Sequence, residues 1–326
     1  MGSDDGHPGE PVNRSSRPPK WAQVFDRSWL RRLYQVQCTK DEFLERTRHR
    51  VVMRTFADDS RLRIGFLTDF HFGEVVPDAF LRRGAGAIMR MEPDLILLGG
   101  DYWNEGMEGE EAAREILGLL EAPFGIYGVL GNHDHDVSAA GAVELLDGLG
   151  IGTLINEGVL LEDGPEPLWL CGVDDEWYGE PDFEAALEGR PEGVSALALA
   201  HNPVSLLRCS QRWPTLCLSG HTHGGQVCWP DGRAVWVDNA QSLNHSSGWT
   251  RVGSTWLYVS RGIGSATIPL RLYCRPEVTI IDLVGRGALD DGERQEAEAA
   301  AWETPRPGAA VVGTESVAPP RSAADS

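Results

Sequence analysis

LRIGFLTDFH, residues 62–71, is a short apolar run that ends in two polar side chains, Asp69 and His71. A run of this length suits a buried β-strand. Helical patterns at about 77–91, 108–121 and 138–149 separate the early runs of this kind. The alternation predicts an α/β core of layered sheets with helices outside. The further runs are DLILLGGDYW (94–103), GIYGVLGNHDH (125–135), LWLCGVDD (168–175), ALALAHNP (196–203) and LCLSGHTHGG (216–225).

The later part of the chain adds two strands without helices between them. STWLYVSRG (254–262) and PEVTIIDLV (276–284) are expected to complete the second sheet. Both termini are rich in small, proline and charged residues, and neither can bury enough apolar surface to offset its ordering entropy. We therefore expect disorder in residues 1–20 and in most of the acidic tail 286–326, apart from a short helix at 293–302. These limits place the main domain at 61–285, after an amphipathic helix and a lead-in strand at 21–60.

The composition excludes several classes of protein. The 326 residues carry a formal net charge of −20, which argues against a protein that tracks nucleic-acid phosphates. The six cysteines form no CxxC pair, so we expect reduced, mostly buried thiols. No apolar run reaches the length of a membrane-spanning helix, and the first 20 residues lack the apolar stretch of a secretory signal. A cytoplasmic location is the default prediction.

The residues that close the apolar runs form a chemically coherent set. Strand ends in an open α/β sheet converge on a crevice where ligands bind. The set offers oxygen and imidazole donors and no thiolate, which favours Mn, Fe, Zn or a similar divalent ion over a closed structural zinc site. The set contains too many donor residues for one ion, and their number suits two ions that share a bridging ligand. Its members are Asp69, His71, Asp101, Asn132, His133, His201, His221 and His223.

The order of these blocks resembles that of the calcineurin-like metallophosphoesterases. DxH at 69–71, GD at 100–101, GNHD at 131–134, His201 and GHTH at 220–223 occur in the family's order. The resemblance spans about residues 60–285. The stretches AHNP, SGHTHGGQV, SRGIGS and CRPEVTIIDL are similar to the bacterial YkuE/YaeI-type phosphodiesterase branch. The fold implied is a four-layer α-β-β-α sandwich of two packed mixed sheets flanked by helices.

The resemblance also implies a role for each residue of the set. One ion would bind Asp69, His71 and His223, and the other would bind Asn132, His201 and His221. Asp101 would bridge the two ions, with an activated hydroxide between them as the nucleophile. His133 would stand beside the substrate and protonate the leaving oxygen or stabilise developing charge. Asp134 would orient His133.

The substrate is less well defined by the sequence. A small phosphodiester, a pyrophosphate-linked nucleotide or a lipid-linked phosphate fits a locally positive centre in an acidic protein, whereas a nucleic acid does not. Tyr102 and Trp103 could form an apolar wall for a substrate, or simply pack the loops onto the scaffold. Arg261 could contact a phosphate, or could be a surface arginine.

Residues 21–36, WAQVFDRSWLRRLYQV, show apolar positions near helical spacing with arginines on other positions. Such a helix can dock on the domain, or it can lie peripherally at the inner face of a membrane. Three functional hypotheses follow. We expect a phosphodiesterase or pyrophosphatase; a phosphomonoesterase, including a protein phosphatase, is the alternative, and a non-catalytic metal-bound scaffold is the third.

Overall fold

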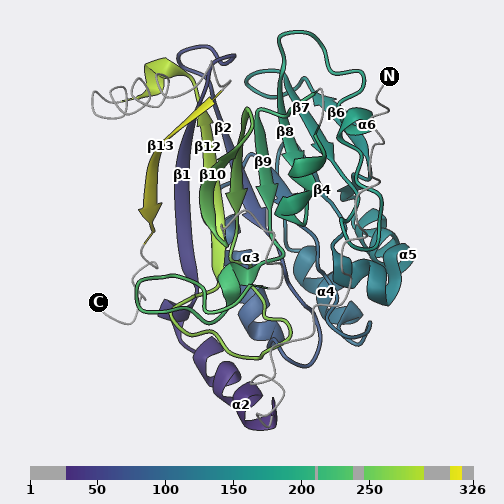
Figure 1. Ribbon diagram of the computed structural model, residues 1–326, viewed down its shortest axis with the longest axis vertical. Coiled ribbons are helices and arrows are strands. Elements are labelled where there is room, and N and C mark those ends of the chain that lie inside the picture. Colours follow the sequence, from purple (N-terminus) through teal and green to yellow (C-terminus); the bar gives the residue numbers. More distant parts are fainter. Residues whose placement is uncertain (1–26, 210–211, 238–245, 290–308, 318–326) are drawn as a thin grey trace, which may run out of the picture.

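Two β-sheets lie face to face at the centre of the protein in the computed structural model, which describes residues 27–209, 212–237, 246–289 and 309–317 (Figure 1). The first sheet is mixed, and within it β2 pairs with β3, β3 with β4 and β4 with β5, each in parallel. Its strands, in spatial order, are β13 (Ala309–Ser316), β1 (Glu45–Met53), β12 (Glu277–Val284), β2 (Arg61–Leu67), β3 (Leu95–Leu98), β4 (Ile126–Gly128) and β5 (Gly152–Thr153).

The second sheet is also mixed. Its four central strands are parallel, and an antiparallel strand closes each edge. In spatial order they are β10 (Gly248–Val252), β11 (Thr255–Val259), β9 (Leu216–Ser219), β8 (Ser195–Leu199), β7 (Leu168–Gly172) and β6 (Glu157–Leu161).

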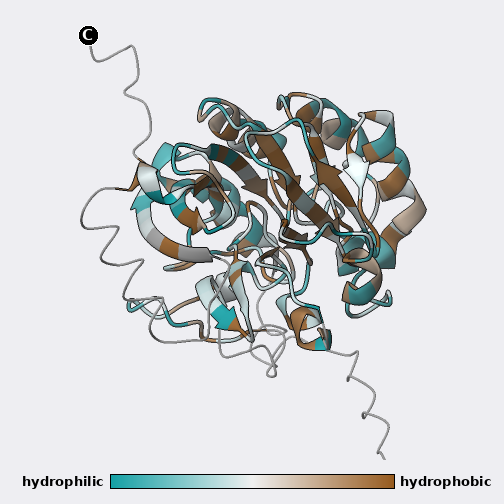
Figure 2. Cartoon of the chain, turned by 90° about the horizontal axis from the view of Figure 1, so that it is seen from above, coloured by the Kyte–Doolittle hydropathy of each residue, from teal (hydrophilic) through white to brown (hydrophobic). Residues whose placement is uncertain are grey.

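The helices lie outside the two sheets, and Figure 2 shows the hydrophobic strands enclosed between them. The α-helices are α2 (Arg27–Cys38), α3 (Asp78–Met89), α4 (Glu110–Leu117), α5 (Asn132–Gly148) and α6 (Phe183–Ala186). Short 3-10 helices occur at η1 (Asp41–Phe43), η2 (Pro203–Arg208), η3 (His223–Gly225) and η4 (Arg286–Ala288).

Alternation of side chains along each strand explains the layers. In β3, Leu95 and Leu97 point into the core between the sheets, while Ile96 and Leu98 join the core beneath α3, α4 and α5. The outer face of the second sheet is covered by a third core that includes Phe183 of α6 and residues of η2. The predicted α-β-β-α sandwich of two mixed sheets is therefore confirmed, with a thin outer helical layer on the second sheet.

The structure corrects the placement of the late strands. PEVTIIDLV was expected in the second sheet, but β12 lies in the first sheet, parallel to β1 and antiparallel to β2. All eight residues of β12 are buried. A strand buried on both faces carries no periodicity that would indicate which sheet it joins, so only the non-local pairing decides.

The fold also extends beyond the domain limits expected at 61 and 285. Before residue 61, strand β1 pairs with β12. After residue 285, strand β13 pairs antiparallel with β1, although it lies in the tail that was expected to be largely disordered. The run AAVVGTES can form this strand because the edge of β1 offers it unpaired backbone groups. The tails 1–20, 290–308 and 318–326, including the helix expected at 293–302, lie outside the described residues.

Two helices differ in extent from the segments that the sequence predicted. The helix expected at 138–149 begins at Asn132, and non-helical backbone at Ser138 separates its first turns from the remainder. Helix α2 covers Arg27–Cys38 of the amphipathic segment and docks on the domain through the buried side chains Leu30, Tyr34 and Cys38. Among the described residues, no helix has the length and apolar character needed to cross a membrane.

Candidate metal centre

Both sheets direct their strand ends toward one crevice. Asp69 follows β2, Asp101 follows β3 and Asn132 follows β4, and these strands are parallel neighbours in the first sheet. His201 follows β8 and His221 follows β9, which are parallel neighbours in the second sheet. The carboxyl ends of parallel strands meet at one edge, so ligands that lie far apart in the sequence are brought together.

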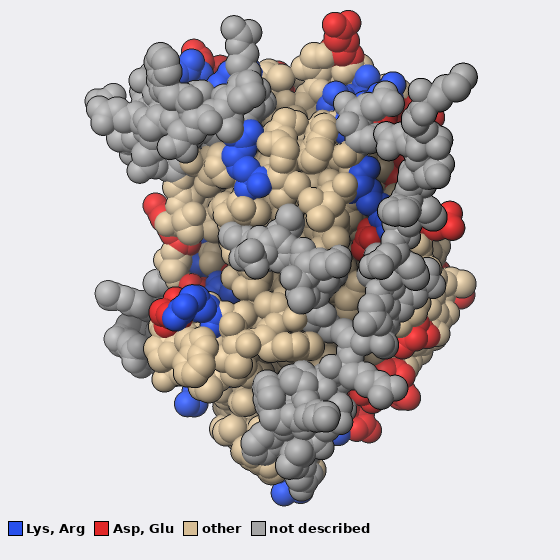
Figure 3. Space-filling view, viewed as in Figure 1, with Lys and Arg blue, Asp and Glu red and all other residues tan. Residues whose placement is uncertain are grey.

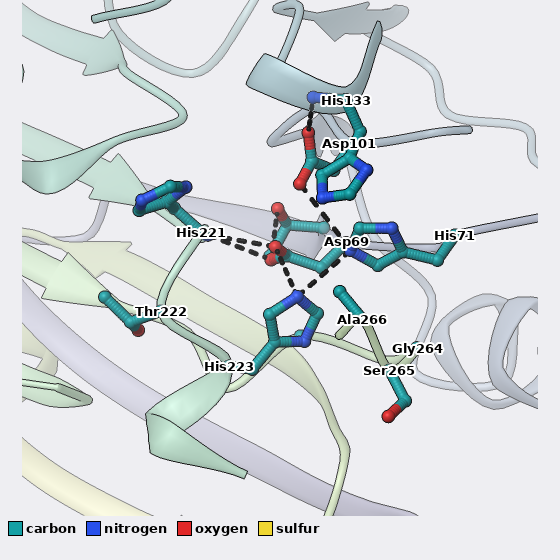
Figure 4. A network of polar contacts seen from close by, with 12 residues as sticks. Asp69, His71, Asp101, His133, His221, Thr222, His223, Gly264, Ser265 and Ala266 are labelled. Carbon is teal, nitrogen blue, oxygen red and sulfur yellow. Dashed lines mark hydrogen bonds and ion pairs between the residues drawn. The ribbon is translucent and has the colours of Figure 1, made fainter. Parts of the chain in front are cut away.

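Four of the predicted ligands form a tight, buried cluster, shown in Figure 4. Ligand atoms of Asp69, His71, Asp101 and His223 all lie within 4.8 Å of one another. His71 Nε2 is 3.0 Å from His223 Nε2 and 3.5 Å from Asp101 Oδ2. His223 Nε2 is 3.3 Å from Asp69 Oδ1. Such separations suit donor atoms arranged around one divalent ion.

The remaining predicted ligands lie on the other side of Asp101. His201 Nε2 is 3.2 Å from Asp101 Oδ2, and His221 Nδ1 is 2.8 Å from Asn132 Oδ1. Nε2 of His221 is buried without a hydrogen-bond partner. A buried polar atom without a partner is costly, and a divalent ion would satisfy the imidazole of His221 directly. The donors present therefore fit metal binding.

The backbone of the centre is strained at the same residues. Asp69, His71, Asp101, His221 and His223 all have φ between 49° and 70°. L-residues rarely adopt this left-handed region, and backbone strain of this kind gathers at functional sites. Five of the ten described non-glycine residues with positive φ are predicted metal ligands, so the strain itself marks the centre.

Hydrogen bonds fix the orientation of two histidines. Nδ1 of His71 donates to the carbonyl of Trp103 at 3.1 Å, and Nδ1 of His201 donates to the carbonyl of Gly99 at 2.7 Å. Each contact places the proton on Nδ1 and leaves Nε2 to face the crevice. This is the usual support for a metal-binding imidazole.

Burial determines the charge state of most of the imidazoles. It lowers the pKa of His71 and of His221 to about 3, and it lowers the pKa of His223 well below its ordinary value. These rings are therefore neutral at neutral pH, as metal binding requires. Burial also opposes a charge on His201, but the neighbouring Asp101 carboxylate raises the pKa of His201 to about 10. A metal ion at this position would displace that proton.

His133 lies beside the cluster, and its side chain is half-buried. Its backbone N–H donates to Asp101 Oδ1 at 2.9 Å, and its Nδ1 donates to the carbonyl of Asn104 at 2.8 Å. The ring of His133 meets the ring of His71 edge-on at 4.8 Å. Nδ1 is thus occupied, and Nε2 is the ring nitrogen left to act on a substrate.

Asp134 holds the backbone of the loops around the centre. Its carboxylate accepts hydrogen bonds from the backbone N–H groups of Gly131, Asp101, Tyr102 and Trp103, at 2.8 to 3.2 Å. No hydrogen bond joins the His133 ring to Asp134 among the described residues, although, against the effect of burial, the Asp101 and Asp134 carboxylates contribute to the raised pKa of His133. Asp134 therefore fixes the loop that carries Asp101, and its orienting of His133 stays a prediction from the sequence.

The structure also corrects the three weaker substrate assignments. The side chains of Tyr102 and Trp103 are 0% exposed and lie in the core beneath α3 to α5, so they pack the loop onto the scaffold. Arg261 directs its guanidinium to the carboxylates of Glu277 and Glu45. An arginine engaged by two carboxylates is already neutralised, and it lines a different cavity from the metal centre.

Sequence reasoning missed Arg271, which is 2% exposed and touches the centre. Its Nη2 lies 3.2 Å from His223 Nδ1, and most of its other contacts are with backbone carbonyls, which include those of Gly264 and Arg261. No carboxylate pairs with it among the described residues. Its neighbour sequence, PLRLYCR, carries no pattern that would separate it from the surface arginines.

A two-sheet α/β fold with a histidine–carboxylate cluster at its strand ends defines a class of metal-dependent hydrolases. Residues 62–225 match the family model of the calcineurin-like phosphoesterases. The chain is 33% identical over 249 residues to phosphodiesterase YaeI of Escherichia coli, covering 74% of this chain and 89% of that protein. It is 30% identical over 221 residues to metallophosphoesterase YkuE of Bacillus subtilis, covering 66% and 77%.

The chain belongs to the calcineurin-like phosphoesterase family, and it is a metal-dependent hydrolase of phosphoesters. Among solved structures it is similar to the NAD nucleotidase NadN of Haemophilus influenzae, at 14% identity and a TM-score of 0.41. That similarity covers 64% of this chain and less than half, 46%, of the other chain.

Proposed function

We propose that the protein is a phosphodiesterase or pyrophosphatase with a centre for two divalent ions, Mn being the first to test. Asp69, His71 and His223 would hold one ion, Asn132, His201 and His221 would hold the other, and Asp101 would bridge them. The observation that carries this proposal is the position of Asp101 Oδ2, which is 3.5 Å from His71 Nε2 and 3.2 Å from His201 Nε2. One carboxylate thus faces both sets of ligands.

When bound, such ions neutralise phosphate charge and activate water for attack on phosphorus. The protein's own groups supply the remaining steps. His133 is held by Asn104 through Nδ1, so that its Nε2 can give a proton to the leaving oxygen. Asp101 fixes the backbone of His133, so the proton donor and the ligand set keep a constant relative position.

Space for a substrate lies beside this centre. A cavity of about 420 Å³ is lined by Phe72 and Gly73, which follow His71, by Asn104, which holds His133, and by Ser265 and Ala266. This volume suits a small organic ligand. A small phosphodiester or a lipid-linked phosphate could place its phosphate at the centre and its leaving group in the cavity. The name of the relative YaeI, a phosphodiesterase, supports the diester over the monoester.

A lipid-linked substrate would be compatible with membrane contact through residues 21–36, because Ser28 and Arg31 of α2 line the same cavity. The cytoplasmic location and the exclusion of nucleic acid stay predictions from the sequence. The net charge of −20 supports the exclusion of nucleic acid, since long-range repulsion disfavours polyanionic substrates.

The decisive experiment compares bis-p-nitrophenyl phosphate with p-nitrophenyl phosphate, using metal-stripped protein with Mn²⁺ added back. We expect diester turnover that requires the metal. His133→Ala should lower kcat by about 10²- to 10⁴-fold and keep the metal content. His135→Ala is the matched control, because His135 lies on the same helix but pairs with Asp174. A preference for the monoester would favour the phosphatase alternative, and full metal content in Asp101→Ala would refute the bridged centre.

A further inference from the structure

The exposed apolar side chains of the protein gather at one end. Eleven large apolar side chains are exposed among the described residues, and seven of them lie on three segments: α2, 226–237 and 266–275. Large exposed apolar patches mark surfaces that bind a partner or a membrane. We call this set the aromatic surface; it consists of Trp29, Leu33, Val36, Trp229, Val235, Leu272 and Tyr273.

The three segments lie side by side although they are remote in sequence. Leu30 of α2 packs with Ile268, and Gln37 Nε2 donates to the carbonyl of Arg271 at 3.0 Å. The N–H of Cys228 donates to the carbonyl of Leu272 at 2.9 Å. Figure 1 shows α2 and these loops together at the lower end of the molecule. The aromatic surface is therefore one continuous region of the fold.

Helix α2 carries apolar side chains on two faces. The inner face, with Leu30, Tyr34 and Cys38, is buried against the domain. Trp29 and Leu33 lie four residues apart and are 48% and 42% exposed. A helix that needs only to dock would carry polar residues at these outer positions. These exposed side chains of α2 therefore form part of the aromatic surface.

The charge of the three segments is opposite to that of the protein. In sequence they contain six arginines and one aspartate, Asp231, whereas the whole chain has 49 acidic and 29 basic residues. Arg271 is buried, and Arg31, Arg233 and Arg275 each pair with a carboxylate, so the excess of positive charge at this surface is smaller than the count of arginines. The side chains of Arg233 and Arg275 are 80% and 53% exposed. In Figure 3 red atoms are frequent along the right-hand side, and the atoms of described residues that show at the lower end are mostly tan with a few blue ones. A basic, apolar surface on an acidic protein is complementary to an anionic apolar partner.

We propose that the aromatic surface docks the protein on an anionic lipid bilayer. Tryptophan and tyrosine rings favour the headgroup region of a membrane, and arginines beside them attract anionic lipids. The bilayer would contact α2 and both loops together, with no segment crossing it. This binding does not depend on the proposed hydrolysis. Only one consequence does: docking would bring the cavity lined by Arg31 and Phe72 close to the lipid headgroups.

The test is co-sedimentation of the full chain with sucrose-loaded vesicles. One set contains equal parts phosphatidylglycerol and phosphatidylcholine, and the other contains phosphatidylcholine alone. We expect binding to the anionic vesicles that weakens as salt is raised, and little binding to the neutral ones. Absence of binding to the anionic vesicles, or equal binding to both sets, overturns the proposal.

Substitutions test whether the aromatic surface is the part of the protein that binds the vesicles. The pairs Trp29→Ser with Leu33→Ser, in α2, and Trp229→Ser with Tyr273→Ser, in the loops, should each lower the bound fraction by about tenfold. The matched control is Leu119→Ser with Leu207→Ser, since these side chains are 44% and 51% exposed outside the surface. Circular dichroism and diester turnover without vesicles report whether each variant is folded. Equal loss in the control pair, or a dimer in light scattering that the surface variants dissociate, overturns the membrane assignment.

Discussion

Arg271 Nη2 lies 3.2 Å from Nδ1 of His223, so a fully buried arginine lies directly behind a predicted metal ligand. Histidine ligands usually direct their second nitrogen to a carboxylate or a carbonyl. Here the guanidinium instead spans several carbonyls of the loop after β11, including those of Gly262 and Gly264, and the carbonyl of His223 itself. It thereby ties η3 to that loop.

Replacement of Arg271 should therefore weaken metal binding. Lysine keeps the charge but cannot reproduce the planar fork, so Arg271→Lys should lower metal affinity by about 10- to 100-fold. Isothermal titration with Mn²⁺ measures the effect. Arg275→Lys is the matched control, because Arg275 is half-exposed and pairs with Glu45 on the surface. Unchanged affinity in Arg271→Lys would show that charge alone is sufficient.

Gly131 should tolerate no side chain. A Cβ at this position would lie 2.2 Å from Asp101 Oδ1, which is closer than any real contact, whereas its φ of −107° suits any residue. Gly131→Ala should displace the Asp101 carboxylate and lower metal content and turnover together, as measured by elemental analysis. In the control Gly86→Ala, the added Cβ meets only the end of the Arg90 side chain, at 3.2 Å, and both quantities should stay the same.

Metal binding should stabilise the fold. A ligand that binds only the native state at 100 times its Kd contributes about 2.7 kcal/mol. For a domain of this size that corresponds to an increase in Tm of roughly 5–10 °C. Thermal unfolding with Mn²⁺ and with a chelator measures the difference. The difference should vanish in Asp101→Asn, and its persistence there would place the stabilising metal elsewhere.

His49 should make stability depend on pH. It is 4% exposed on β1 and contacts the hydroxyl of Tyr258, and burial lowers the pKa of His49 to about 4. The unfolded chain takes up this proton near pH 6.5, so the folded state loses stability as pH falls from about 6.5 to about 4. The loss attributable to His49 is roughly 3 kcal/mol.

The comparison with His49→Gln isolates this effect. Glutamine does not titrate, while the acidic groups titrate in both proteins and cancel in the difference. Urea unfolding at several pH values should show the stability advantage of the natural protein shrinking below pH 6.5. A difference in the free energy of unfolding between the two proteins that does not change with pH would contradict the assignment of this pH dependence to His49.

The sequence predicted much of the fold because its signals are local. Each apolar run of four to seven residues became a strand, and the intervening helices appeared as α3, α4 and the second part of α5. The start of α5 was missed because Asn132 and His133 read as the end of a strand, whereas the helix begins at Asn132, directly after Gly131. Strand β13 was missed because its sequence resembles the rest of the tail and is ordered only by pairing with β1.

The sequence by itself determined which residues end the strands, and hence the list of ligand candidates, because strand length and side-chain type are local properties. Tertiary structure alone decided how these candidates meet. Parallel pairing in two sheets brought Asp101 between His71 and His201. It also gave Asp134 three backbone donors from residues 101–103, and it buried Arg271 against His223. The physical reason is that these contacts join residues that are about 30 to 100 positions apart in the sequence. Only the packing of the sheets decides how far apart such residues lie in space.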